Sequence, residues 1–379
     1  MTPEGGRGPR LAMVLWGGYV GGAERLSVAL TERLRGLGAD VTMVYLQKPW
    51  SLAALMATAG VPHRSLGFAR GRGAVRHPRR YARLVSEVGA DGALLVDCGI
   101  MGGALRAGGY RGPIVAVEHG EVLGLRRRSL VRRCLWRIGR LSGARADDAE
   151  VAVSDYMLGE MRRYPHARRI RRIYNGIDTE AYAPRNGLGE GNAVDSVVGF
   201  AGRLISGKGA DHLIRAVAAA AEQVPIKLLI AGDGPERSHL ESLAQALDVV
   251  AAVDFLGVVD DAPAFLRSCD IVAVPSDAFV ESFSMTTLEA MACGVAVVAS
   301  RNGAIPELML DGETGTLVEP GDSRALTQAI VTYAERPELR HAHGAAARAR
   351  AIERFQLQDC ARAYLNLFSE LAARPSAQG

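Results

Sequence analysis

The sequence predicts an α/β protein with two doubly wound parallel sheets. Short β-branched runs alternate with stretches of helical periodicity, and this alternation begins again in the second half of the chain. A chain of 379 residues is longer than one hydrophobic core usually fills, and a hydrophobic content of 48% is enough to bury two sheets. We therefore expect two domains of similar build that face each other across a cleft.

In the first half, the apolar run at 11–16 predicts a strand, the glycine-rich stretch at 17–22 a turn, and 23–37 an amphipathic helix. A second strand is predicted at 41–46, which completes the opening of a doubly wound sheet. In the second half, short β-rich runs predict strands at 197–201, 227–231, 253–256, 271–275 and 295–299.

The polar, glycine-rich segment at 183–193 (APRNGLGEGNA) breaks both the helical and the strand periodicity, so it predicts a hinge. The two domains are expected at 1–183 and 194–353. Because ligands of open parallel sheets bind beyond the carboxyl ends of the strands, the cleft between the domains is the expected site.

Composition argues against a membrane or secreted protein. No apolar run reaches the roughly 18 residues of a membrane span, and the polar start with its short apolar run does not resemble a signal peptide. The cysteines are odd in number and unclustered, which argues for a reducing compartment and against a zinc site: Cys98, Cys134, Cys269, Cys293 and Cys360. We expect a cytoplasmic protein.

Charge is divided unevenly along the chain. Residues 1–178 carry 29 Lys and Arg against 15 Asp and Glu, a net charge of +14, and the remainder carries 16 against 26, a net charge of −10. The basic half is therefore expected to receive an anionic substrate. Nucleic-acid binding is disfavoured, because no aromatic ladder or known module accompanies the charge.

The densest basic segment, Arg126–Arg145 (RRRSLVRRCLWRIGRLSGAR), has apolar residues on one side and arginines around them. It fits weak peripheral contact with an anionic membrane or a grip on an anionic acceptor. It also fits a helix that packs on the core with a solvated arginine face, and the arginine-rich composition favours this second interpretation.

Two carboxylates, Glu281 and Glu289, lie eight positions apart across a predicted loop-to-helix junction. The first backbone N–H groups of that helix are unpaired within it and favour an anion in front of them; they belong to Phe283, Ser284 and Met285. The segment thus offers donors for a diphosphate and two acceptors for hydroxyls, as a nucleotide diphospho-sugar requires. The plainer alternative is that the glutamates only complement the helix dipole, worth roughly 0.3–1 kcal/mol.

A second segment, Val197–Gly209 (VVGFAGRLISGKG), predicts a strand that runs into a glycine-rich turn carrying Arg203 and Lys208. The chain has only three lysines, so a lysine at this place is not explained by composition. A guanidinium and an ammonium on one strand-end loop form a clamp for a diphosphate. The stretch also matches the core of a P-loop, but Gly209 stands where that motif needs the Ser or Thr that binds Mg²⁺.

These segments resemble, in order, the retaining GT-B glycosyltransferases of family 4. The resemblance rests on GGAER (21–25), NGID (175–178), AGRLISGKG (201–209), AGDGPE (231–236), FLGVVDD (255–261) and ESFSMTTLEAMACG (281–294). It is strong over 175–322 and thinner before. It implies two Rossmann-like domains, with a last helix, at about 354–379, packing back on the first.

The resemblance also implies roles for residues of the second half. Arg203 and Lys208 match donor-diphosphate ligands, Glu281 a contact of the donor sugar, and Glu289 a ribose ligand. The loop that holds the base in this family makes three residues candidates: Gly257, Val259 and Asp261. Many members have glycine where this chain has Ser284, so the serine hydroxyl is a further candidate for a donor contact.

In the first half, Gly21 and Gly22 match a loop over the donor, and His119 matches a histidine beside the donor sugar. A lone histidine is otherwise as often a satisfied core residue. The catalytic set implied by the resemblance is Glu281, His119, Arg203 and Lys208.

The chain has no Asp-x-Asp pair, which metal-dependent transferases commonly use. Cationic side chains and a helix N-terminus can stabilise the leaving diphosphate instead, so we expect neither metal nor cofactor. Retention by the front-face route fits this set.

The residues leave open the base (UDP, GDP or dTDP), the sugar and the acceptor, which could belong to the cell envelope, a small molecule or a natural product. Two alternatives are a nucleotide-sugar epimerase of the same shape and a non-catalytic subunit that binds the donor.

Overall fold

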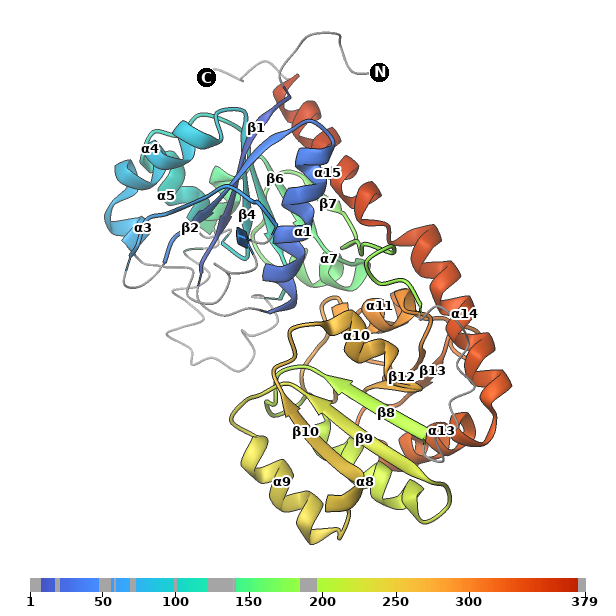
Figure 1. Cartoon of the computed structure of the whole chain (residues 1–379). Coiled ribbons are helices and arrows are strands. Elements are labelled where there is room, and N and C mark those ends of the chain that lie inside the picture. Colours follow the sequence, from blue (N-terminus) through green and yellow to red (C-terminus); the bar gives the residue numbers. More distant parts are fainter. Residues whose placement is uncertain are drawn as a thin grey trace. The chain divides into compact units, whose positions relative to one another are not determined.

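Two parallel sheets organise the chain (Figure 1). The computed structural model describes residues 8–17, 21–47, 56–57, 59–68, 73–98, 101–120, 139, 141–184 and 196–373. The chain forms two units, Met1–Gly176 with Leu357–Gly379, and Ile177–Gln356. Each unit contains one sheet with helices on it, so the predicted α/β fold with two doubly wound sheets is confirmed.

The first unit has a seven-stranded sheet in the order β3-β2-β1-β4-β5-β6-β7, in which neighbouring strands pair in parallel. Its strands are β1 (Arg10–Leu15), β2 (Asp40–Tyr45), β3 (His63–Ser65), β4 (Gly92–Val96), β5 (Ile114–Glu118), β6 (Ala149–Ala152) and β7 (Ile170–Arg172). Its helices include α1 (Gly22–Gly36), α3 (Gly73–Arg76), α4 (Pro78–Val88), α5 (Gly102–Ala107), α7 (Asp155–Met161) and α15 (Leu357–Ala372).

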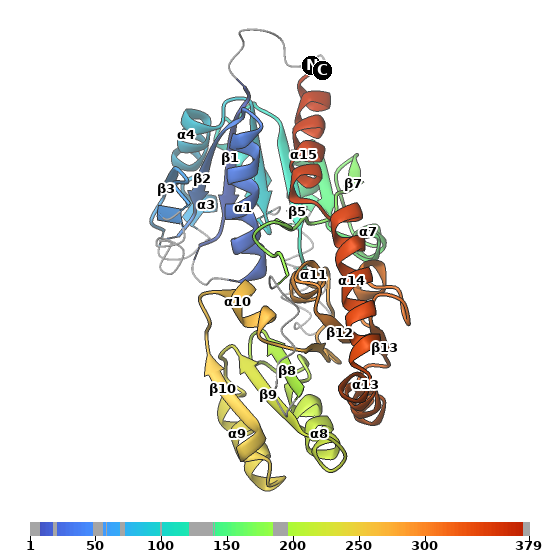
Figure 2. The same cartoon turned by 45° about the vertical axis from the view of Figure 1, so that its right-hand side comes forward.

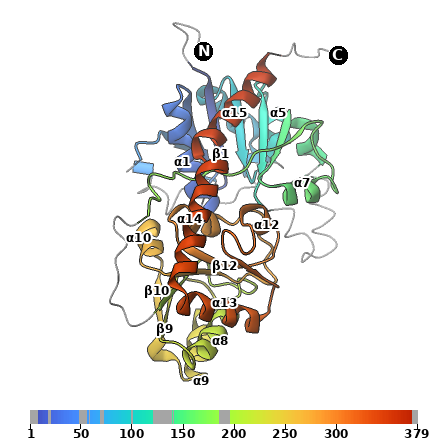
Figure 3. The ribbon, with the colours of Figure 1, turned by 90° about the vertical axis from the view of Figure 1, so that its right-hand side faces the viewer.

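Side chains of β1 alternate between the two faces of this sheet, as strand geometry requires. Ala12 and Val14 are buried in one cluster with Tyr81 of α4. On the other face, Met13 accepts a hydrogen bond from Thr31 of α1, with 3.3 Å between Oγ1 and Sδ. Helices α1 and α15 pack against each other on that face, and Figure 3 shows α15 in red across the sheet.

The C-terminal helix begins at Leu357, after α14 has ended at Arg354. Its Phe368 lies beside Gly92 of β4 and Leu11 of β1, since a Cβ built on Gly92 would come within 2.5 Å of the Phe368 ring and 3.0 Å of Leu11 Cδ2. The missing side chain of Gly92 is therefore what lets α15 approach the strands.

The second unit has a six-stranded sheet in the order β10-β9-β8-β11-β12-β13, again with parallel neighbours. Its strands are β8 (Ser196–Ala201), β9 (Ile226–Ala231), β10 (Val253–Gly257), β11 (Ile271–Val274), β12 (Ala296–Ser300) and β13 (Thr316–Val318). Its helices are α8 (Ala210–Ala221), α9 (Arg237–Ala246), η3 (Val250–Ala252), α10 (Ala262–Arg267), α11 (Met285–Ala292), α12 (Ile305–Leu308), α13 (Ser323–Glu335) and α14 (Pro337–Arg354).

One face of this sheet forms a continuous core with α8, α9 and α13, through buried residues such as Leu213, Leu240 and Ile330. Helices α11 and α14 contact β12 and each other. Figure 2 shows α13 and α14 beside the β12–β13 edge. The expected strands of this half are all present, and β13 is added to them because three residues are too few to show a period of two.

The segment Ile177–Ala183, here called the connecting segment, belongs to the second unit. The Ile177 N–H donates to Phe355 O at 2.8 Å, and the Arg348 guanidinium donates to the carbonyls of Thr179 and Tyr182 at 3.3 and 3.2 Å. The division between units therefore falls after Gly176. The hinge expected at 183–193 lies mostly outside the described residues.

Of the basic segment Arg126–Arg145, only 139 and 141–145 are among the described residues, so its two interpretations stay predictions. Across the described ranges, no helix combines the length and the apolar character that crossing a bilayer demands.

We predict that Gly92→Ala destabilises the first unit by about 1–3 kcal/mol, because the new methyl group overpacks the contact with Phe368. The matched control is Gly36→Ala at the end of α1, where a Cβ meets no atom within 4 Å. That change should be neutral or stabilise by about 0.4–1 kcal/mol through the unfolded state. Urea unfolding of both variants checks this; equal midpoints for Gly92→Ala and the wild type would contradict the packing of α15 on β4.

Candidate functional site

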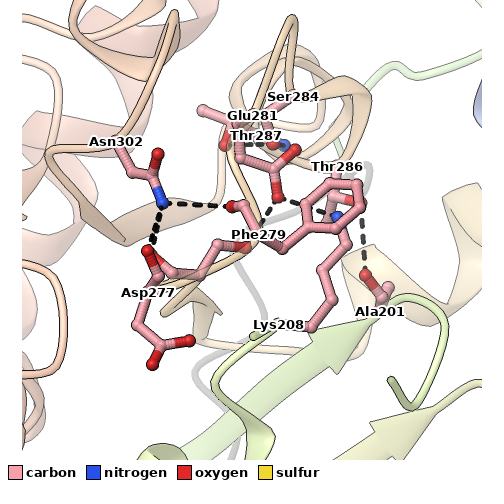
Figure 4. Close-up of polar contacts among 10 residues, drawn as sticks. Ala201, Lys208, Asp277, Phe279, Glu281, Ser284, Thr286, Thr287 and Asn302 are labelled. Atoms are coloured by element: carbon pink, nitrogen blue, oxygen red, sulfur yellow. Dashed lines mark hydrogen bonds and ion pairs between the residues drawn. The ribbon is translucent and has the colours of Figure 1, made fainter. Parts of the chain in front are cut away.

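In the second unit, the loops that follow β8 and β11 meet through a buried ion pair. Lys208 Nζ lies 2.8 Å from Glu281 Oε1, and the two side chains are only 19% and 7% exposed (Figure 4). The ammonium also lies 4.0 Å from the centroid of the Phe279 ring, a cation–π contact. Two residues that sequence alone assigned to different substrate groups therefore contact each other directly.

Glu281 has a second partner in Ser276, whose Oγ donates to the same Oε1 at 2.6 Å. The loop between them is held by Asn302, which follows β12. Its buried Nδ2 donates to the carbonyls of Ser276, Asp277 and Phe279 at 3.0, 3.0 and 3.1 Å (Figure 4). One amide thus fixes the turn that presents Glu281.

Two glycines allow the loops to touch backbone to backbone. Gly207 has a φ of +87°, and its carbonyl accepts from the N–H groups of Asp277 and Phe279, both at 3.0 Å. Gly209 has a φ of +75°, and a Cβ there would lie 1.9 Å from Pro275 O. The glycine-rich turn is therefore required by positive φ and by close approach.

The N-terminus of α11 is capped by Ser284. Its Oγ accepts from Thr287 N at 3.4 Å and from Thr287 Oγ1 at 2.9 Å, so the hydroxyl serves the helix. The Phe283 ring packs edge-on against Phe355, with 6.1 Å between centroids. What Ser284 and Phe283 offer a ligand is therefore their backbone, and Met285 is the first residue of α11.

Two further charged residues predicted to bind the donor, Arg203 and Glu289, differ in their surroundings. Arg203 is exposed, and its guanidinium makes no hydrogen bond or ion pair with another described residue. Glu289, in the second turn of α11, accepts a hydrogen bond from Tyr182 Oη at 3.2 Å. The connecting segment therefore reaches the carboxylate that was predicted to bind ribose.

The loop after β10 contains the residues predicted to hold the base. Gly257 has a φ of +70°, and its carbonyl accepts from Gly232 N at 2.7 Å. Asp261 caps α10, with Oδ1 accepting from Ala264 N at 2.8 Å, so its side chain already has a structural role. Val259 lies between them, and α10 contacts α11.

In the first unit, His119 directly follows β5 and lies against Asp97, which follows the neighbouring strand β4. Asp97 Oδ1 accepts from the His119 backbone N–H at 2.7 Å and lies 3.5 Å from His119 Nδ1. Burial by itself lowers the pKa of His119, but Asp97, by charge and hydrogen bond, and then Glu118 and Glu24 outweigh burial, so the pKa is raised.

Gly21 and Gly22 begin α1. Gly21 is the N-cap, and its N–H donates to Glu24 Oε2 at 3.0 Å, while Gly22 is the first helical residue. Among the residues that the structure describes, no cluster of three or more His, Cys, Asp or Glu side chains could hold a metal ion.

The predicted residues thus form two groups, one in each unit. The sequence reasoning missed five supporting residues: Asp97, Tyr182, Ser276, Phe279 and Asn302. For Asp97 and Asn302 a signal existed, because each is a polar residue just after a buried parallel strand, where sites gather.

Comparison with known families matches both halves of the chain. Residues 190–350 match the family described as Glycosyl transferases group 1, and residues 20–181 match the family described as Glycosyltransferase Family 4.

Three relatives have names that include a sugar or a glycosyl group. The GDP-mannose-dependent alpha-(1-6)-phosphatidylinositol monomannoside mannosyltransferase of Mycolicibacterium smegmatis is 34% identical over 274 residues, 67% of this chain and 68% of that protein. The N-acetyl-alpha-D-glucosaminyl L-malate synthase of Bacillus anthracis is 29% identical, over 60% of this chain and 61% of that protein. The D-inositol 3-phosphate glycosyltransferase of Saccharomonospora viridis is 34% identical, over 54% of this chain and 51% of that protein.

Solved structures share the fold. The Anabaena protein HepE, in complex with UDP and glucose, matches with a TM-score of 0.82 at 24% identity, covering 95% of this chain and 99% of that one. Sucrose-phosphate synthase from Thermosynechococcus elongatus matches with a TM-score of 0.79 at 20% identity, covering 97% and 100%. With both halves matched and one relative 34% identical over two thirds of each protein, the chain belongs to glycosyltransferase family 4 and has the GT-B fold.

Proposed function

We propose that this protein is a retaining, metal-independent glycosyltransferase that moves a sugar from a nucleotide diphospho-sugar to an acceptor hydroxyl. The observation that carries the proposal is the buried Lys208–Glu281 pair in the same unit as the N-terminus of α11. The name of the relative from Mycolicibacterium smegmatis, which depends on GDP-mannose, supports a nucleotide-sugar donor.

Each side chain has a chemical role in this proposal. The exposed guanidinium of Arg203 and the ammonium of Lys208 balance the charge that develops on the leaving diphosphate, together with the N–H groups at the start of α11. Lys208 and Ser276 both bind Oε1 of Glu281, so Oε2 is the oxygen that accepts from a sugar hydroxyl. Because Glu281 is held on a fixed turn, this acceptor is preorganised.

We propose further that the acceptor is anionic. Residues 1–178 carry a net charge of +14, and such a field attracts anions. The names of the three relatives include a phosphatidylinositol mannoside, L-malate and an inositol phosphate, all of which carry negative charge.

Activity without metal and with retention is the direct test. A thermal-shift panel of UDP-, GDP- and dTDP-sugars first selects the donor, because ligand that binds the folded state raises Tm. The EDTA-treated protein should then glycosylate its acceptor at the untreated rate, and NMR should show the anomeric configuration of the donor in the product. A strict requirement for Mg²⁺ or an inverted product would refute the corresponding part, and epimerised donor in the absence of acceptor would favour an epimerase.

Arg203 and Lys208 should respond differently to truncation. Arg203→Ala should lower kcat by about 10²–10³-fold, for one lost charge interaction in the transition state, and leave stability unchanged. Lys208→Ala should lower kcat as well and also destabilise the second unit by about 3–5 kcal/mol, because buried Glu281 loses its cation. Initial rates and urea unfolding measure both effects; wild-type kcat in both variants would remove them from the site.

Alanine substitutions of Glu289 and Glu281 should affect nucleotide binding and turnover differently. Glu289→Ala should weaken the bare nucleoside diphosphate and the full donor alike, by about 1–3 kcal/mol for a lost charged hydrogen bond. Glu281→Ala removes the carboxylate that pairs with Lys208 and leaves the ammonium for the diphosphate, so it should not weaken the bare nucleotide. It should lower kcat, because the lost oxygen serves the sugar. Calorimetry with both ligands on both variants checks the assignment, which is wrong if Glu281→Ala weakens the bare nucleotide as much as Glu289→Ala does.

A further inference from the structure

Asp97 has an unusual backbone for its residue type. Its φ is +50°, and outside the glycines only Asp97 and Asp248 have positive φ among the described residues. Such a conformation is sparsely populated and persists where the surroundings hold it. Here Trp16 Nε1 donates to Asp97 O at 2.6 Å, and the Asp97 carboxylate accepts from His119 N at 2.7 Å. The strained residue is thus held from both its backbone and its side chain.

The consequence of this conformation is the direction of the carboxylate. Asp97 and His119 directly follow the neighbouring strands β4 and β5, so both lie at the carboxyl edge of the first sheet. Asp97 Oδ1, already bonded to the His119 backbone, is 3.5 Å from Nδ1 of the ring. A negative charge this close to Nδ1 orients an imidazole and favours the form protonated on both nitrogens, in which Nε2 carries a proton that it can donate.

The other charged groups that act on the His119 ring are carboxylates, as in Asp97. Glu118 of β5 is buried and accepts from Gly120 N at 3.2 Å, and Glu24 of α1 also favours the protonated ring. On α15, burial, Cys360 and Asp97 all raise the pKa of Tyr364, so this phenol stays neutral. Asp97, Glu118 and Glu24 therefore all favour the cation of His119.

We propose that Asp97 is the positioning residue of His119: it holds the ring from its Nδ1 side, so that Nε2–H donates to the transferred sugar. This inference rests on the proposed function for the sugar contact, and on the contacts above for the pairing. In the protonated state the pair with Asp97 is neutral overall, which lets an imidazolium lie at the site without adding net charge. Activity is therefore present below the pKa of His119 and is lost as pH rises through it.

The test uses two substitutions at the two ends of β4. Asp97→Asn keeps the shape of the side chain, and asparagine tolerates positive φ, so the variant should fold. The matched control is Asp91→Asn, just before β4, where the carboxylate accepts from Arg10 N at 2.8 Å. His119→Gln identifies the His119 signal among the eight histidines in NMR spectra of the full-length protein.

In Asp97→Asn, the titration midpoint of the His119 ring should move to lower pH, and the alkaline limb of the kcat profile should move with it. Between the two midpoints, kcat should fall by about 10–100-fold, as for a lost charged hydrogen bond in the transition state. Asp91→Asn should change neither.

An unchanged His119 titration midpoint in Asp97→Asn would overturn the pairing of Asp97 with His119. The NMR titration does not depend on enzyme activity, so it tests the pairing even if the proposed function fails. A shifted midpoint with an unshifted kcat profile, or activity that rises as His119 deprotonates, would overturn the donor role.

Discussion

The buried ion pair between Lys208 and Glu281 is the interaction on which the geometry of the candidate site in the second unit depends. Removing two charges from water costs on the order of several kcal/mol per ion, which only good geometry and further hydrogen bonds repay. Ser276 supplies such a bond to the same oxygen, and the Phe279 ring covers the ammonium. All of these contacts require that the loops after β8 and β11 lie in direct contact.

Close contact of the loops explains residues that carry no chemistry themselves. A Cβ at Gly209 would lie 1.9 Å from Pro275 O, and one at Gly303 would lie 2.0 Å from Glu281 O. Asn302 then ties the turn of residues 276–279 to the end of β12 with a single buried amide. The glycines let the loops approach each other, and the asparagine holds the turn by hydrogen bonds. Together they fix the position of the Glu281 carboxylate relative to three neighbouring strands.

Both units use the carboxyl ends of adjacent parallel strands in the same way, with different results. In the first unit, Asp97 after β4 holds His119 after β5. In the second, Asn302 after β12 holds the turn after β11. Because parallel strands end at one edge of a sheet, a polar residue at the end of one strand is well placed to support the candidate site residue at the end of the next.

The sequence by itself determined the elements and the local motifs. The strand expected at 197–201 is β8 at Ser196–Ala201, and the helix expected after the loop of Glu281 is α11, because periodicity and capping are local properties. Arg203, Lys208, Glu281 and Glu289 could be named as candidate donor ligands for the same reason, since their spacing follows from a strand, a turn and a helix start, and their roles stay predictions.

Only the tertiary structure decided which of these groups meet. Lys208 and Glu281 are 73 positions apart, Tyr182 and Glu289 are 107 apart, and Asp97 and His119 are 22 apart. It also assigned the side chains of Ser284 and Asp261 to helix caps. Such pairings depend on strand order and on the direction in which each turn leaves its strand, and neither quantity leaves a periodic trace in the sequence.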